Sequence, residues 1–90
     1  MAISRDGSRL YVTNKKDGTV SVVNALTFQV IDTITVQSEP GGIALSPNGR
    51  VLFVANFGSN TLSVIDAGDR KVIRTVSVGE APDDITLLPR

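Results

Sequence analysis

The chain has 90 residues, of which nine are Lys or Arg and nine are Asp or Glu, and it contains neither Cys nor His. The balanced charge offers no electrostatic footprint for nucleic acid. Without thiol or imidazole groups the chain has no disulfide, no cysteine nucleophile, no histidine base and no zinc or haem site of the usual ligand types. No run of about 18 or more apolar residues occurs, so we expect neither a membrane span nor a signal peptide.

The first half of the chain predicts four short strands. Residues 1–4 form the first strand and turn at Asp6-Gly7, because Asp-Gly between apolar segments is a strong hairpin signal. Three further strands, rich in β-branched residues and separated by turn residues, are predicted over residues 9–14, 19–24 and 30–36. The fourth strand is the most polar, as suits an exposed edge.

The second half repeats the first with a period of 42 residues. Residues 1–48 align on residues 43–90 without an insertion and give 18 identities among 48 pairs. Periods of about 40 to 45 residues are typical of propeller blades or helical repeats, and the β-branched, period-two filling favours blades. We therefore predict one blade over residues 1–36, a second over 43–78, and the first strand of a further blade over 85–88.

The second strand of each repeat is apolar at almost every position, as Val51-Leu52-Phe53-Val54-Ala55 shows. A strand that is apolar on both faces must be covered on both faces, and neighbouring blades of a propeller provide that cover. We predict an all-β fold with two four-stranded antiparallel sheets, which are β-propeller blades. The outer faces are expected to be lined by Val12, Val20, Val22, Phe53, Val54 and Val64.

Exposed apolar faces of this kind predict a homo-oligomeric ring, or a chain that is a fragment of a larger propeller. With two blades per copy a homo-ring holds an even number of blades, so the candidates are a trimer of six blades and a tetramer of eight. We expect the C-terminal strand at 85–88 to complete a neighbour's blade and the N-terminal residues 1–4 to be displaced.

The tetrad Tyr11-Val12-Thr13-Asn14 resembles the YVTN family of β-propeller repeats. The Ser-x-x-Gly segments at 4–7 and 46–49 and the segment from Pro40 to Ala44 resemble it too, so that the likeness covers essentially the whole chain. The resemblance implies a propeller fold, in rings that usually hold about seven blades in one chain. It also suggests an exported or cell-surface protein, and related propellers include lactonase-like and quinoprotein-like enzymes.

In propellers of this connectivity the loops after the second and fourth strands share one rim, where ligands usually bind. The candidate ligand-binding residues on this rim are Lys15, Lys16, Phe57, Asn60, Glu80, Asp83 and Asp84. The two lysines either hold an anion or are exposed turn charges, and Phe57 either stacks on a ligand or contacts a neighbouring blade. The acidic residues either take a hard cation such as Ca²⁺ or form a solvated loop.

These observations predict a non-enzymatic scaffold for ligand binding or for cell-surface and protein interaction. We expect copies of the chain itself as partners, and no catalytic residue, resident metal, cofactor, nucleic-acid partner or membrane insertion. One alternative is a fragment of a lactonase-like hydrolytic propeller, which would need convergent carboxylates from Glu80, Asp83 and Asp84. The other is a small oligomeric lectin, although the absence of Trp disfavours an aromatic sugar platform.

Overall fold

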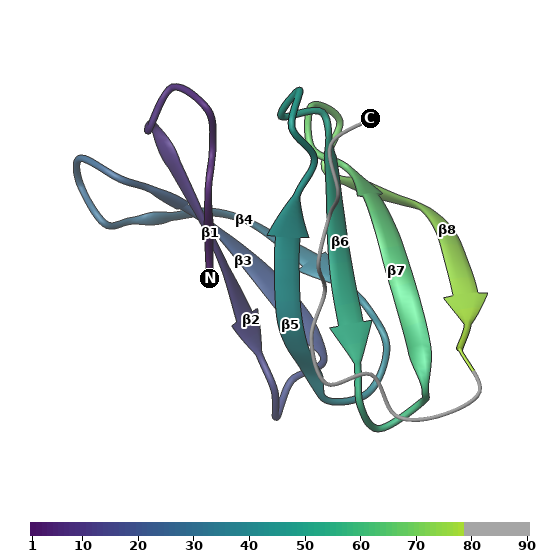
Figure 1. Cartoon of the computed structure of the whole chain (residues 1–90). Helices are drawn as coiled ribbons and strands as arrows, with labels where there is room; N and C mark the ends of the chain where they lie inside the picture. Colours follow the sequence, from purple (N-terminus) through teal and green to yellow (C-terminus); the bar gives the residue numbers. More distant parts are fainter. Residues whose placement is uncertain (79–90) are drawn as a thin grey trace.

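The computed structural model describes residues 1–78, which form two four-stranded antiparallel sheets. Each sheet follows the order of its strands along the chain (Figure 1). The first sheet contains β1 (Ala2–Ile3), β2 (Arg9–Asn14), β3 (Thr19–Asn24) and β4 (Val30–Thr35). The second contains β5 (Pro40–Leu45), β6 (Val51–Asn56), β7 (Thr61–Asp66) and β8 (Lys71–Ser77). The predicted all-β architecture is confirmed, and the strand expected at 85–88 lies outside the described residues. In the single chain the N-terminal residues are not displaced, since Ala2 and Ile3 pair with Tyr11 and Leu10 of β2.

Within residues 1–78 no helix is long and apolar enough to cross a bilayer.

The turn between the first two strands of each sheet is built by the same three polar groups. In the first sheet the Asp6 carboxylate accepts hydrogen bonds from the Ser4 hydroxyl at 2.8 Å and the Ser8 amide at 3.0 Å. The Ser4 hydroxyl oxygen in turn accepts from the Arg9 amide at 3.0 Å. Gly7 completes the turn with a φ of 75°, which glycine adopts without a steric cost.

The second sheet reproduces this turn with an amide in place of the carboxylate. The Ser46 hydroxyl donates to Asn48 Oδ1 at 2.6 Å, and the Arg50 amide donates to the same oxygen at 3.0 Å. Gly49 again has a φ of 75°. The Ser-x-x-Gly segments are therefore the residues that set the first hairpin of each blade.

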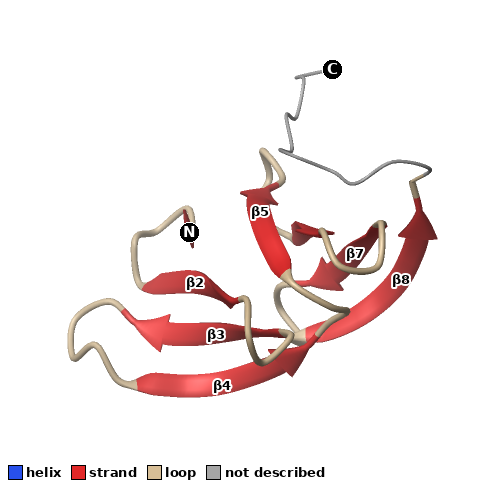
Figure 2. Ribbon diagram, turned by 90° about the horizontal axis from the view of Figure 1, so that it is seen from below, coloured by secondary structure: helices blue, strands red, loops and turns tan. Residues whose placement is uncertain are grey.

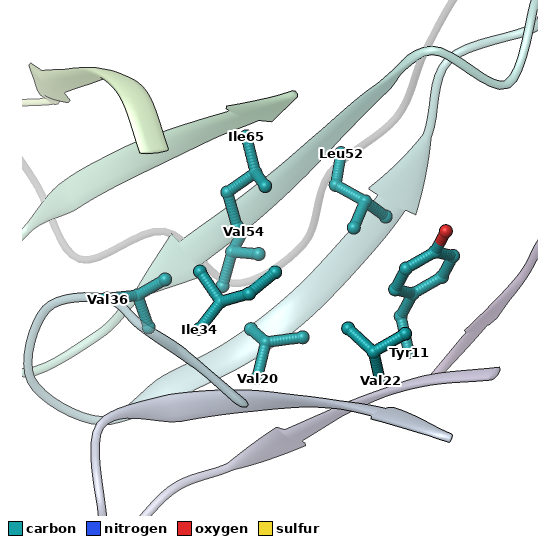
Figure 3. Close-up of a cluster of buried hydrophobic side chains, with 8 residues drawn as sticks. All are labelled: Tyr11, Val20, Val22, Ile34, Val36, Leu52, Val54 and Ile65. Atoms are coloured by element: carbon teal, nitrogen blue, oxygen red, sulfur yellow. The ribbon is translucent and has the colours of Figure 1, made fainter. Parts of the chain in front are cut away.

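The two sheets pack face to face and bury one apolar core between them (Figure 2). Strand β5 contacts β1 and β2, while β4 contacts β8 on the opposite side of the pair. The first sheet contributes Tyr11, Val20, Val22, Ile34 and Val36, and the second contributes Leu52, Val54 and Ile65. Figure 3 shows these side chains meeting from the two sheets.

Part of the expected outer surface lies instead in this core. Val20, Val22 and Val54 were expected on the outer faces in contact with water, and that expectation is wrong, since all three are fully buried between the sheets. Val12, Phe53 and Val64 are only partly buried and lie on strand positions of the opposite faces. Successive residues of a strand point to opposite faces, so the packing of one sheet on the other covers only half of each strand.

An ion pair joins the two sheets at their outer strands. Arg70, in the turn between β7 and β8, places Nη1 3.6 Å from Asp32 Oδ2 on β4. Because both side chains are substantially exposed, water screens the pair, which contributes on the order of 0–1 kcal/mol. The pair marks where the outer edges of neighbouring blades meet.

Candidate functional site

The candidate rim is built from three short segments that backbone hydrogen bonds hold together. The turn 15–18 joins β2 to β3, and the amide of Val36 donates to the carbonyl of Gly18 at 2.9 Å. The connection 37–39 joins β4 to β5, and its last two carbonyls accept the amides of Phe57 and Gly58, each at 3.0 Å. The rim therefore belongs to both sheets.

These segments surround an open hollow of about 360 Å³. Lys15, Lys16 and Asp17 line one side of the hollow, and Gln37, Ser38 and Glu39 line the other. Two cations, two carboxylates, an amide and the hydroxyl residues Thr35 and Ser38 thus line one solvent-open space. Such a lining can bind a polar ligand through charge and hydrogen bonds, and it contains no aromatic platform for a sugar.

Phe57 lies at an interblade contact. The ammonium nitrogen of Lys15 lies 5.8 Å from the centroid of the Phe57 ring, within the range of a cation–π interaction. The same ring occupies the space in which a Cβ at Gly41 would stand. Of the two interpretations of Phe57, the structure shows the contact with the neighbouring blade, and it brings Lys15 and Phe57 together across the two sheets.

Asn60 is separated from the hollow and sits in the turn between β6 and β7. Its φ is 52°, and the repeat-equivalent Gly18 has a φ of 66°. Asparagine is among the few non-glycine residues that tolerate this left-handed conformation. A turn requirement accounts for Asn60 without a ligand.

The acidic candidates Glu80, Asp83 and Asp84 lie outside the described residues. Among residues 1–78, no group of three or more His, Cys, Asp or Glu side chains is placed to hold a metal ion.

The recurring asparagines at the ends of β2 and β6 tie each second strand to the third. Asn14 Nδ2 donates to the hydroxyls of Thr19 at 3.0 Å and Ser21 at 2.7 Å. Asn56 Nδ2 makes the equivalent bonds to Thr61 at 3.2 Å and Ser63 at 3.0 Å. Their repetition in both blades is thus explained by hairpin structure.

The rim on the other side of the molecule contains charged residues that the sequence analysis passed over. Arg5 and Arg9 line a second hollow between the sheets. A comparison of the two repeats could have identified them, because the equivalent positions of the second blade are the uncharged residues Pro47 and Val51.

Comparison with known proteins supports the architecture. Residues 1–89 match the YNCE-like beta-propeller family. A stretch of 45 residues is 53% identical to the seven-bladed beta-propeller protein Rv1057 of Mycobacterium tuberculosis, covering 50% of this chain and 12% of that protein.

Solved structures show the same arrangement of strands. The chain is similar to a hydrazine synthase structure from Kuenenia stuttgartiensis, with a TM-score of 0.86 and 33% identity over 91% of this chain and 23% of that one. It is also similar to the Cps50 (Swd1) beta-propeller domain from Myceliophteria thermophila, with a TM-score of 0.77 and 25% identity over 89% of this chain and 25% of that one. Apo AztD from Citrobacter koseri matches at the level of the fold, with a TM-score of 0.77 and 19% identity over 91% of this chain and 23% of that one.

The chain therefore spans a quarter or less of the length of each of these relatives. The family match covers nearly all of the chain, and the two stacked four-stranded sheets agree with it. The chain belongs to the YNCE-like beta-propeller family.

Proposed function

We propose that the chain is a blade pair of a non-enzymatic β-propeller scaffold. In this proposal the repeat is of the YVTN type, further copies of the chain cover the outward sheet faces, and the loop rim binds a ligand. The observation that carries the proposal is the relation between the buried and the outward faces, because each outward face is the repeat equivalent of a face that is already buried inside the chain.

The outward face of the second sheet matches the buried face of the first. Its apolar residues are Phe53, Leu62, Val64, Val76 and Val78, the equivalents of Tyr11, Val20, Val22, Ile34 and Val36. The outward face of the first sheet carries Leu10, Val12 and Val23, the equivalents of Leu52, Val54 and Ile65. The first sheet of one copy would therefore offer the second sheet of another copy the same kind of contact that already exists within the chain.

Side chains at the outer edge support the same head-to-tail orientation of neighbouring copies, although the pair of residues there differs from the pair within the chain. Within the chain Arg70 pairs with Asp32. Between copies the equivalent positions are Phe28, whose side chain is 74% exposed, and Arg74, which is also exposed. An arginine over an aromatic ring is an attractive pair, so the substitutions in the two repeats change together in a compatible way.

Burial of these faces would stabilise an assembly substantially. Fully burying one large aliphatic side chain contributes about 1.5–3 kcal/mol. Each interblade contact buries several such residues against the entropic cost of association, and a closed ring leaves no outward face uncovered. A homo-ring of two-blade copies has six or eight blades and never seven, unlike the M. tuberculosis relative, whose name describes seven blades in a longer chain.

The rim hollow is the ligand-binding surface in this proposal. Lys15, Lys16 and Glu39 give it charges of both signs, which suits a small polar ligand or a protein loop. Phe57 and Asn60 support the rim, and Glu80, Asp83 and Asp84 remain its proposed acidic members. The resemblance to YVTN repeats supports an exported or cell-surface role.

The assembly is tested by one lysine substitution on each outward face. Val12→Lys should block the face of the first sheet, and Leu62→Lys should block the face of the second. In analytical ultracentrifugation each variant alone should sediment as a single chain, because a closed ring needs both faces. A one-to-one mixture should form a dimer, since each variant keeps the face that the other has lost.

The matched control is Asp69→Lys, in the exposed turn between β7 and β8, which should keep the mass of the unsubstituted chain. Circular dichroism should verify that each variant is folded. If both variants kept the original mass, or if their mixture stayed monomeric, the head-to-tail arrangement would be wrong.

A further inference from the structure

The second hollow, about 300 Å³ in volume, opens between the two sheets on the rim opposite the candidate ligand site. Arg5, Arg9 and Tyr11 of the first sheet line one wall of this hollow, and Gly49, Ala67 and Gly68 of the second line the other. All of these residues belong to one chain, so the hollow exists whether or not copies assemble.

Arg9 holds a buried donor that has no acceptor in the described structure. The side chain starts from the first position of β2, on the same face as Tyr11, and the residue is half-buried. Its Nε atom is buried without a hydrogen-bond partner among residues 1–78. Leaving a buried donor without an acceptor is unfavourable, so Arg9 Nε requires an acceptor that the described residues do not supply.

Neighbouring groups make the hollow electropositive. The Arg5 side chain lies against Gly49, with Cγ 2.9 Å from where a Cβ of that glycine would stand, so Arg5 reaches across to the second sheet. Within residues 1–78 neither Arg5 nor Arg9 has a carboxylate within ion-pair distance. Two guanidinium groups thus line the space with a single carboxylate, that of Asp6.

The Asp6 carboxylate is occupied by its own turn. Its Oδ1 atom accepts hydrogen bonds from the Ser8 amide, the Ser8 hydroxyl at 2.7 Å and the Ser4 hydroxyl. These bonds, and more weakly the charge of Arg9, lower the pKa of Asp6 to about 2. Asp6 therefore stays anionic and committed to the turn, and it leaves Arg9 Nε without a partner.

The fold itself does not require these arginines. The second blade makes the same strand and turn with Val51 in place of Arg9 and Pro47 in place of Arg5. The hydroxyl of Tyr11, whose ring is buried, points out of the apolar cluster and away from Val20 and Val36 (Figure 3), and Tyr11 is among the residues that line the hollow. Phe53, the equivalent of Tyr11 in the second blade, lacks this hydroxyl.

We propose that this hollow is a binding site for a small oxyanion of the carboxylate or phosphate class. The Nε–H of Arg9 and its terminal N–H groups form a fork that matches two oxygens of such an anion. Arg5 supplies the second positive charge, and the Tyr11 hydroxyl donates to the anion from the wall of the hollow. The anion accepts a hydrogen bond from the buried Nε–H of Arg9 and links the two blades at the end of their shared core.

Isothermal titration of the 90-residue chain with inorganic phosphate, and separately with acetate, tests the proposal at constant ionic strength in sodium chloride. At least one anion should bind, and Arg9→Met should weaken it by about tenfold or more, because a charge-assisted bidentate contact is lost. Arg9→Lys should restore only part of the affinity. The control is Arg50→Met. Arg50 follows Gly49 in the turn between β5 and β6, is exposed and lies outside the hollow, so this variant should bind the anion with the affinity of the unsubstituted chain.

A thermal melt gives a second readout that does not depend on measuring weak heats. Phosphate or acetate should raise the melting temperature of the unsubstituted chain and of Arg50→Met, and should raise that of Arg9→Met much less at the same anion concentration. A response to phosphate alone or to acetate alone identifies the class of anion. The proposal would be overturned if phosphate and acetate bound no more tightly than chloride. It would also be overturned if Arg9→Met bound them as tightly as the unsubstituted chain does.

Discussion

Polar side chains at the ends of the strands perform the same structural task in both blades. Asn24 Oδ1 accepts the amides of Leu26 and Thr27, and Asp66 Oδ1 accepts those of Gly68 and Asp69. Asn and Asp readily bond backbone amides two or three residues ahead, which closes a turn. Recurrence of a polar residue in a repeat protein is thus weak evidence for a ligand site, whereas a polar residue at one repeat position only, such as Arg9, is stronger evidence.

The carboxylate of Asp6 makes the stability of the fold depend on pH, whereas the side-chain amide of Asn48, its equivalent in the second blade, does not titrate. The pKa of Asp6 is lowered from 3.8 to about 2 by the hydrogen bonds of Ser8 and Ser4. Because the folded value lies below the unfolded one, the stabilisation is fully present above about pH 4 and is lost as the pH falls from about 4 to 2.

Asp6→Asn should remove this part of the acid sensitivity and still fold, because Asn48 makes the same turn in the second blade. The measurement is the urea midpoint of both proteins at pH 6, 4 and 2.5, at one protein concentration. Their difference should shrink as the pH falls. A difference that stays constant with pH would show that the ionised carboxylate contributes nothing at this position.

At the scale of the strand, the sequence was sufficient to predict most boundaries. The second and third strands of each repeat were expected where β2, β3, β6 and β7 occur, because β-branched runs end at turn residues. Strand β5 begins earlier than the predicted apolar segment, at Pro40, and its register with β6 shifts between Pro40 and Ile43. Two glycines in that interval concealed the strand, since glycine is a weak strand former.

The face on which each strand is covered could not be predicted in the same way. Val12 and Val20 are equally apolar, yet Val20 is buried and Val12 remains partly exposed. Which face meets the neighbouring blade depends on how two sheets stack, a non-local property that a period-two pattern does not contain. The sequence pattern does not predict the contact of Lys15 with Phe57 either, because these two residues lie on different blades.

The start of β5 depends on a glycine that makes room for an aromatic ring. Gly41→Ala would bring its Cβ into overlap with the Phe57 ring, so the ring must leave Gly41 and its contact with Lys15. We expect a destabilisation of about 1–2 kcal/mol in urea unfolding. In a Phe57→Ala background the same substitution should cost much less, because the space is then free.

This double-mutant cycle separates crowding from backbone preference. Equal costs of Gly41→Ala in the two backgrounds would mean that the ring is not what requires glycine. The structure predicts unequal costs, since the overlap is with the side chain of Phe57 and the φ of Gly41 is not positive.

At the scale of the whole molecule, the two blades form one interface and present two outward apolar faces, which are the repeat equivalents of the two halves of that interface. Leu10 and Val12 on one side and Leu62 and Val64 on the other repeat the residues of the interblade core. The sequence predicted the need for cover on both faces, and the structure shows the contact that a neighbouring blade would make. It also shows an ion pair at the outer edge, which propensity and pattern did not reveal.

Ring assembly is tested most simply by the mass of the 90-residue chain in solution, measured by multi-angle light scattering behind size exclusion at micromolar concentration. A homo-ring of two-blade copies should elute as a single species with three or four times the mass of one chain, corresponding to six or eight blades. A monodisperse single chain at that concentration would contradict ring assembly, because two blades would then be stable with both outward apolar faces in water.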